Sequence, residues 1–388
     1  MTATRSQAPR ACETCLRRLQ LLGVLTPFIE KVATGEPGGR SAELLALADD
    51  ALARAVAGRK AERLLAEAAE ADPPVLRRRL READCWVVCR HDDAYPEALR
   101  DAGDAPPALV GRGDPAGLGR LRPEATVTVV GARRATSSGR EIARTLAREL
   151  AAAGFAVVSG LAWGIDGAAH EGALDGGFTA AVLGCGADVA YPLHHRGLYE
   201  RVREHGLILS ELPPGTGAWR WAFPARNRIM AALGAMTIVV EAAGRSGSLI
   251  TSELASELGR EVGAVPGPVG ARMSAGTNQL IADGAQLVRD AEDVLDTLIG
   301  PGARRPVLGG PELDPPLAAV LERVENGDAD SDSIAIALGC GGDEATANLA
   351  RLELLGYVQR SFAGVYSRTA LPPPDDAAPA TDLSSLNM

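Results

Sequence analysis

The sequence predicts an α/β protein in which a parallel-sheet core lies between a small N-terminal helical domain and a C-terminal winged-helix domain. Two observations support this prediction. From Thr126 onward, short runs of apolar and β-branched residues alternate with helical segments, which is the pattern of a parallel sheet covered on both faces. Near the C-terminus, three short helical segments precede a hairpin, as in a winged helix.

Length and composition indicate an ordinary globular protein. The chain has 388 residues, of which 46% are hydrophobic and 23% are charged, enough for about two or three domains. No apolar run is long enough to cross a bilayer, and residues 1–10 lack the apolar stretch of a secretory signal. We therefore expect a cytoplasmic protein without a membrane partner.

The formal net charge of −10 is unevenly distributed. The segment from Asp290 to Met388 carries a net charge of −11, and the rest of the chain carries +1. A nearly neutral region can still contain a local basic groove for phosphates. Nearly all basic residues are arginines, whose guanidinium groups bind phosphate in a bidentate manner and stack on bases.

Changes in composition predict the domain boundaries. Leucines at helical spacing fill residues 11–82, whereas the linker is rich in glycine and proline and the tail in proline, alanine and aspartate. We expect a helical domain at 1–84, the α/β core at 85–299, a linker at 300–312, a winged-helix domain at 313–370 and a disordered tail at 371–388.

Seven short apolar runs are predicted to be strands of the core, and the segment Tyr95–Asp114, which is rich in proline and glycine, is predicted to form loops. The expected strands are Trp86–Val88, Thr126–Val130, Phe155–Ser159, Thr179–Leu183, Leu207–Leu209, Thr237–Val240 and Val262–Val265.

The first motif, residues 130–139, follows a strand and opens a helix. Gly131 allows close backbone approach, Thr136 or Ser137 can cap the helix, and free N–H groups there bind anions. Arg133 and Arg134 add positive charge. The alternative is an ordinary strand-to-helix turn with surface arginines.

The second motif, residues 159–166, is another turn of this kind and contains Gly160. Its Asp166 is expected to be a charge at a helix N-terminus rather than a catalytic acid. His170, among small residues, is expected to be a packing residue rather than a base.

The third motif combines aromatic residues with arginines, a combination that suits single-stranded nucleic acid because bases stack and guanidinium groups hold phosphates. The alternative is that Trp221 and Phe223 belong to the core. The motif contains Trp219, Trp221, Phe223, Arg226, Asn227 and Arg228.

The fourth motif, residues 241–251, places Arg245, Ser246, Gly247 and Ser248 between a strand and a helix. The three turns of the first, second and fourth motifs should lie along one carboxyl edge of the sheet. A row of anion sites fits a polyanion better than it fits one mononucleotide.

Together with four further segments, these motifs resemble the DNA-processing protein A (DprA/Smf) family from about Asp93 to Leu298. The further segments are residues 184–192, 210–215, 264–267 and 276–281. The resemblance implies an extended Rossmann fold and a single-stranded DNA binder that is not an enzyme and needs no cofactor. It also implies a homodimer that protects incoming DNA and helps to load a RecA-type recombinase in natural transformation.

The resemblance carries the family's DNA contacts to Arg133, Arg226, Arg228 and Arg245. This chain departs from the family pattern at two positions. Ala132 replaces a small polar residue, and Leu193 stands where many members have a lysine, a charge that Arg196 can replace.

Two other hypotheses concern metal and catalysis. Cys12, Cys15 and Cys89, with either Cys85 or His91, could supply four ligands to zinc, although inert buried thiols are the default. The rival function is a nucleotide phosphoribohydrolase-like enzyme, for which Glu211 or Glu241 would be the catalytic carboxylate.

In the C-terminal domain, acidic residues dominate the candidate recognition helix, which contains Asp343, Glu344 and Glu353 beside Arg351. Such a surface repels phosphate. We expect this module to contact protein, or to modulate the groove, rather than to read duplex DNA.

Overall fold

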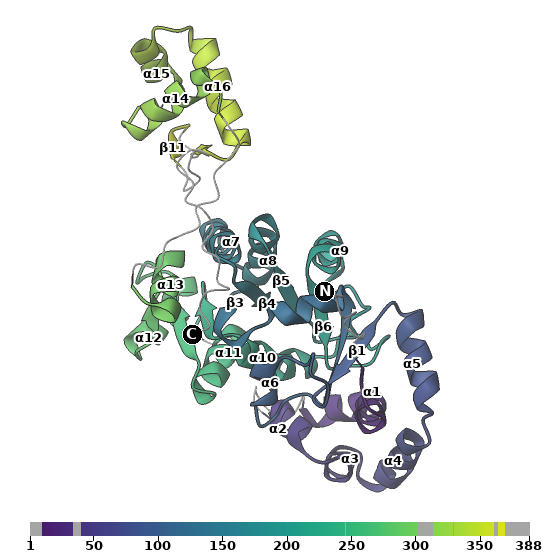
Figure 1. Cartoon of the computed structure of the whole chain (residues 1–388). Coiled ribbons are helices and arrows are strands. Elements are labelled where there is room, and N and C mark those ends of the chain that lie inside the picture. Colours follow the sequence, from purple (N-terminus) through teal and green to yellow (C-terminus); the bar gives the residue numbers. More distant parts are fainter. Residues whose placement is uncertain are drawn as a thin grey trace. The chain divides into compact units, whose positions relative to one another are not determined.

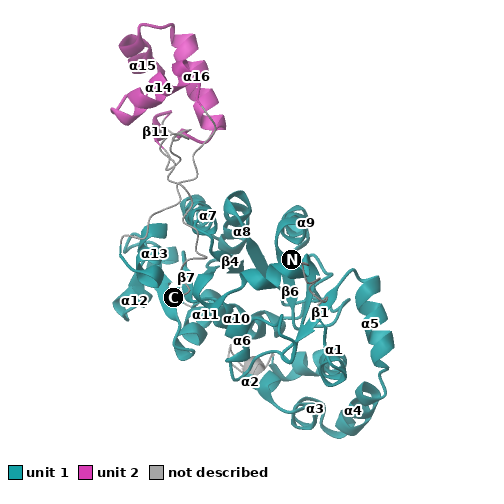
Figure 2. Cartoon of the chain, in the orientation of Figure 1, with its two compact units in different colours: residues 1–303 teal, residues 304–388 magenta. Residues whose placement is uncertain are grey.

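The computed structural model of the chain describes residues 10–33, 40–244, 246–301, 313–328, 330–360 and 364–368. Two compact units are distinguished, residues 1–303 and residues 304–388 (Figure 2). Most of the predicted linker and the whole predicted tail lie outside the described residues.

The first unit begins with helices whose apolar faces pack onto the sheet and its neighbours. Leu16 of α1 shares a hydrophobic cluster with Val87 of β1, and Leu64 of α4 shares another with Trp221. The predicted boundary after residue 84 therefore separates elements that share a core. The helices are α1 (Glu13–Ala33), α2 (Arg40–Ala46), α3 (Asp49–Ala57), α4 (Ala61–Ala69) and α5 (Pro73–Glu82).

A nine-stranded, mostly parallel sheet forms the centre of this unit, which is Rossmann-like. Its spatial order is β1-β2-β6-β5-β4-β3-β7-β8-β9; β2 pairs antiparallel with β1 and β6, and all other pairs are parallel. The strands are β1 (Trp86–Cys89), β2 (Ala108–Gly113), β3 (Thr126–Val130), β4 (Ala156–Ser159), β5 (Thr179–Val182), β6 (Leu207–Ser210), β7 (Met236–Val239), β8 (Glu261–Ala264) and β9 (Gln286–Leu287).

The seven expected strands are present, with small shifts at their ends. The expectation that Tyr95–Asp114 contains only loops is wrong, because β2 lies within it, and β9 was also not predicted. Glycines made β2 look like a loop. Gly111 is needed there because a Cβ atom at this position would lie 2.2 Å from the ring of Trp86 on the neighbouring strand.

Helices cover both faces of the sheet (Figure 1). One face is covered by α7 (Ser137–Ala152), α8 (Ile165–Gly176), α9 (Arg196–His205) and α13 (Ala291–Ile299). The other is covered by α6 (Glu97–Arg100), α10 (Ala222–Leu233), α11 (Gly247–Glu257) and α12 (Ala275–Ala282).

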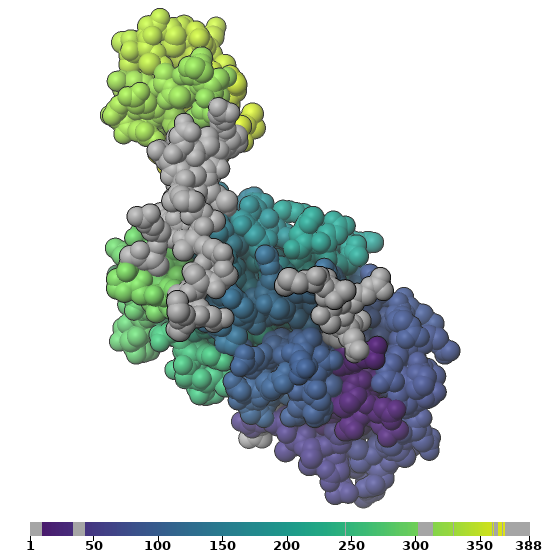
Figure 3. All heavy atoms as spheres, viewed as in Figure 1, coloured from purple at the N-terminus to yellow at the C-terminus, as the bar shows by residue number. Residues whose placement is uncertain are grey.

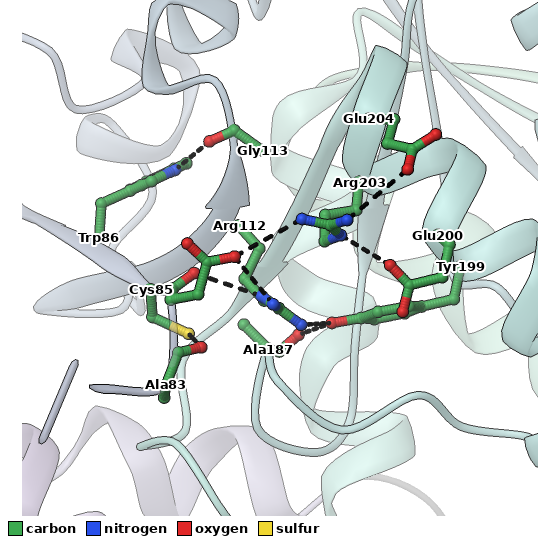
Figure 4. A network of polar contacts seen from close by, with 11 residues as sticks. Ala83, Cys85, Trp86, Arg112, Gly113, Ala187, Tyr199, Glu200, Arg203 and Glu204 are labelled. Carbon is green, nitrogen blue, oxygen red and sulfur yellow. Dashed lines mark hydrogen bonds and ion pairs between the residues drawn. The ribbon is translucent and has the colours of Figure 1, made fainter. Parts of the chain in front are cut away.

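A polar network fastens β2 to α9 and to the turn before β1 (Figure 4). The Arg112 guanidinium donates to the Asp84 carboxylate at 2.9 Å and to the Tyr199 hydroxyl at 3.0 Å. That hydroxyl in turn donates to the carbonyl oxygen of Ala187 at 2.5 Å. The antiparallel part of the sheet is thereby fixed against the parallel part.

The second unit contains the elements that the sequence predicts, three helices followed by an antiparallel hairpin. They are α14 (Pro315–Glu325), α15 (Ser331–Leu338), α16 (Gly342–Leu354), β10 (Val358–Arg360) and β11 (Tyr366–Arg368). Leu317, Ile334, Leu349 and Tyr357 form its buried core. In the described part of the chain, no helix combines the length and the apolar character that a bilayer crossing requires.

Candidate nucleic-acid interface

A pocket of about 520 Å³ opens at the carboxyl edge of the sheet. Strands β4, β3 and β7 are neighbours and parallel, so the turns that follow them meet at this edge. Residues from all three turns line the pocket, as do residues from the start of α10. The first, second and fourth motifs are thus brought together, as the sequence predicted.

Three exposed arginines line the pocket: Arg133, Arg134 and Arg272. Within the described residues, none of them forms an ion pair, so their charges are available to an anion. The Arg133 guanidinium lies 5.4 Å from the centre of the Phe223 ring. Arg272 was not predicted, because it stands alone between the segments that resemble the family and has no motif of its own.

Aromatic residues border the arginines. A smaller pocket of about 40 Å³ is lined by Arg133, Trp163, Tyr191 and Phe223, among others. Trp163 is 46% exposed, and the ring centres of Tyr191 and Phe223 are 5.5 Å apart. Sequence reasoning missed Trp163 and Tyr191 as site residues, although both lie in segments that resemble the family. A large aromatic residue in a glycine-rich turn was the signal that could have found Trp163.

The prediction that Trp221 stacks on bases is wrong. Trp221 is 3% exposed and packs among the N-terminal helices, in the same cluster as Leu25 and Leu64. Residues two positions apart on a helix point in nearly opposite directions. Phe223 therefore faces the pocket while Trp221, just before the first turn of α10, faces the core.

Arg226, which the family resemblance assigns as a DNA contact, is buried in this structure. Its guanidinium donates to the carbonyl oxygens of Gly160, at 2.8 Å, and of Val182, and it lies 3.8 Å from the Asp166 carboxylate. Burial lowers the pKa of Arg226 and raises that of Asp166, and the opposite charge of each partner opposes the shift. Arg226 forms part of the pocket floor.

Arg228 is also buried, at 3% exposure, and its assignment as a DNA contact is wrong in this structure. It forms a bidentate pair with Glu211, with N–O distances of 3.0 and 2.7 Å, and lies 3.5 Å from Asp104. Burial alone lowers the pKa of Arg228, but the Glu211 charge outweighs this effect and raises it. The physical reason is that α10 is buried along its length from Ala225 to Leu233.

The backbone amides of two turns are held by the protein's own carboxylates. Glu241 accepts from the amide and the hydroxyl of Thr136, at 2.9 and 2.5 Å, and Thr136 caps α7. Asp166 accepts from the amides of Gly160 and Ala162 at 3.2 and 3.4 Å. The expectation that these amides are free for phosphate is therefore wrong, while the expected role of Asp166 as a charge at a helix start is confirmed.

His170 is fully buried, as expected for a packing residue. Its Nδ1 lies 2.7 Å from the hydroxyl of Thr179, which itself donates to a backbone carbonyl, so Nδ1 carries the proton. Burial, together with the nearby charge of Arg226, lowers the pKa of His170 to about 3. The imidazole therefore stays neutral at physiological pH.

The other predicted site residues are placed as follows. Ser137 and Arg196 are exposed at the first positions of α7 and α9 and do not line either pocket, and Arg245 lies outside the described residues. Gly160 lines the smaller pocket. The larger pocket is lined by Gly131, Arg133, Arg134, Phe223, Arg226, Asn227, Ser246, Gly247 and Ser248.

Comparison with known proteins adds an independent observation. The family model of DNA recombination-mediator protein A matches residues 86–299. A DNA processing protein DprA of Streptococcus pneumoniae is 44% identical over 210 residues, which are 53% of this chain and 71% of that protein. Protein Smf of Synechocystis is 34% identical over 318 residues, 71% of this chain and 78% of that protein.

Two solved structures of DNA processing protein A are similar to this fold. DNA processing protein A of S. pneumoniae superposes with a TM-score of 0.58 and 34% identity, over 73% of this chain and 95% of that chain. DNA processing protein A of Helicobacter pylori, described for its single-stranded DNA binding mode, superposes with a TM-score of 0.50 and 31% identity, over 55% of this chain and 95% of that chain. The chain therefore belongs to the DNA recombination-mediator protein A family.

Proposed function

We propose that this protein binds single-stranded DNA at the carboxyl edge of its sheet and mediates recombination by helping to load a RecA-type recombinase. The observation that carries the proposal is the meeting of Arg133, Arg134 and Arg272 with the aromatic residues Trp163 and Phe223 around the two pockets. Phosphates would pair with the guanidinium groups, and bases would stack on the rings. The single-stranded DNA binding described for the H. pylori relative supports the same ligand.

The rival function, a nucleotide phosphoribohydrolase-like enzyme, is less well supported. It requires a glutamate that can reach a substrate. Glu211 is 4% exposed and bound to Arg228, and Glu241 is bound to Thr136. Incubation with AMP-type nucleotides tests this alternative, since release of ribose 5-phosphate would support the enzyme.

Fluorescence anisotropy with a labelled oligo-dT strand tests DNA binding. We expect Arg133→Ala combined with Arg134→Ala to weaken binding at least about tenfold, or ~1.4 kcal/mol. The slope of log K against log salt should fall by about 0.7 for each lost phosphate contact. Arg122→Ala is a matched control, because Arg122 is exposed at the opposite end of β3. Equal binding by the double variant and the control would overturn the site.

Recombinase loading and dimerisation belong to the same proposal. Following the family resemblance, we expect a homodimer formed through the late segments of the core. Sedimentation equilibrium measures the oligomeric state. Filament assembly by a purified RecA-type recombinase on strands coated with single-strand binding protein should accelerate when this protein is added. It should not accelerate with the double arginine variant.

A further inference from the structure

A cluster of metal-ligating side chains lies away from the DNA pockets, where α1 meets the end of β1. Cys12 and Cys15 stand at the start of α1, Cys89 ends β1, and His91 lies in the following turn. One ligand atom from each of these four residues lies within 4.8 Å of all the others. The proposed function does not use any of the four residues.

The distances from His91 to the three sulfur atoms fit ligands of one zinc ion. The Nδ1 atom of His91 lies 3.5 Å from the Sγ atoms of Cys12 and Cys15 and 3.8 Å from that of Cys89. In tetrahedral zinc sites, Zn–S bonds of about 2.3 Å and Zn–N bonds of about 2.0 Å place the two ligand atoms about 3.5 Å apart. All three N–S distances are therefore close to the separation between two ligands of one zinc ion.

The surroundings suit thiolate ligands. The amide of Cys12 donates to the Cys89 sulfur at 3.4 Å, and such N–H donors stabilise sulfur that carries negative charge. The amide of Asp92 donates to the carbonyl oxygen of Cys89 at 2.8 Å and closes a turn. This turn brings the His91 ring close to the sulfur atom of Cys89. Cys15 and Cys89 are buried, whereas Cys12 and His91 are exposed, so an ion has a path of entry.

Cys85, the other ligand that the sequence allowed, is excluded by its direction. Its thiol donates to the carbonyl oxygen of Ala83 at 3.4 Å (Figure 4), and it is not a member of the four-residue cluster. The choice between Cys85 and His91 is thereby made in favour of His91.

We propose that Cys12, Cys15, Cys89 and His91 bind one structural zinc ion that fastens the N-terminal helices to the sheet. The site joins residues 77 positions apart in the chain. Figure 3 shows the purple start of the chain lying directly against the blue segment that follows the helices. Four protein ligands leave no open position for substrate, which is the composition of structural rather than catalytic zinc sites.

Metal analysis of the full chain tests the site. The protein is purified under reducing conditions with a tag that does not bind metal, and its zinc is measured by mass spectrometry. We expect about one zinc ion per chain in the wild type and almost none in Cys12→Ser combined with Cys89→Ser. Cys85→Ala is the matched control and should keep its zinc. His91→Ala should lose zinc, whereas His91→Cys should retain it.

A second measurement follows metal binding in the wild-type protein directly. Wild-type protein stripped of metal and refilled with Co²⁺ should show the absorption of a tetrahedral cobalt–thiolate centre. Its melting temperature should rise when zinc is restored, while that of the Cys12→Ser, Cys89→Ser variant should not change.

Three results would overturn the site. The first is a wild type without zinc that also fails to take up zinc or Co²⁺. The second is equal zinc in the wild type and the double serine variant, which means adventitious metal. The third is a disulfide among the three cysteines in protein purified under reducing conditions. None of these measurements involves DNA, so they are independent of the proposed function.

Discussion

The buried pair of Arg228 and Glu211 allows a direct test of whether a residue implied by family resemblance binds DNA or supports the fold. Their side chains are 3% and 5% exposed and joined by two hydrogen bonds. Replacing Arg228 with methionine leaves the Glu211 carboxylate in a site with little access to water. Removing one partner of such a pair costs about 3–5 kcal/mol of the free energy of unfolding.

Urea unfolding followed by tryptophan fluorescence measures this cost, since Trp221 lies in the core of the same unit. The double variant Arg228→Met, Glu211→Leu should recover most of the loss, because replacing both charges by apolar groups is often neutral. Arg289→Met is the control. It breaks a bidentate pair with Asp293 in which the arginine side chain is 70% exposed, and it should change stability much less than Arg228→Met. Wild-type stability of Arg228→Met together with lost single-strand binding would refute the structural assignment.

Three further predictions follow from the same region. Gly160→Ala should destabilise the protein by about 1–3 kcal/mol in urea unfolding, because the new Cβ would lie 2.0 Å from an Arg226 nitrogen. Gly119 has open space around it, so Gly119→Ala should not destabilise the protein. Equal effects of the two substitutions would contradict this reasoning. Trp163→Ala should weaken oligo-dT binding by about 1–3 kcal/mol in anisotropy titrations, whereas Trp163→Phe should retain most of it. His170 has a pKa of about 3 when folded against about 6.5 when unfolded, so the unfolded state binds its proton first as pH falls. Between pH 7 and pH 5 the free energy of unfolding of the wild type should therefore fall by about 2 kcal/mol more than that of His170→Asn. The same dependence of the unfolding free energy on pH in both proteins would argue against a neutral buried imidazole.

Much of the fold could be predicted because the parallel strands are buried on both faces and read as continuous apolar runs. β3 and β7, which are buried throughout, are examples. The antiparallel β2 was missed because Gly111 and Gly113 resemble loop residues. One glycine accommodates the ring of Trp86, and the other adopts a positive φ of 94°. Neither requirement is visible without the neighbouring strand.

The sequence predicted the location of the candidate site but not which of its arginines are exposed. Strand ends locate the pocket, because parallel strands share a carboxyl edge. Whether an arginine faces solvent depends on which carboxylate lies near it in space, and Glu211 and Asp166 come from other elements. Charge in the sequence therefore found Arg133 and Arg134, which an anion can reach, but missed Arg272. On α10 it pointed to Arg226 and Arg228, which are buried.

The carboxylates of Glu241 and Asp166 have a consequence for ligand selection. These carboxylates occupy amides of two turns, and such amides are the donors that cradle the pyrophosphate of a cofactor in related folds. We expect free nucleotides to compete poorly for this edge. Long guanidinium side chains remain for a ligand, and they can follow successive phosphates without fixing one register. A fold that binds one small cofactor in other proteins would thereby favour a polymer with many phosphates here.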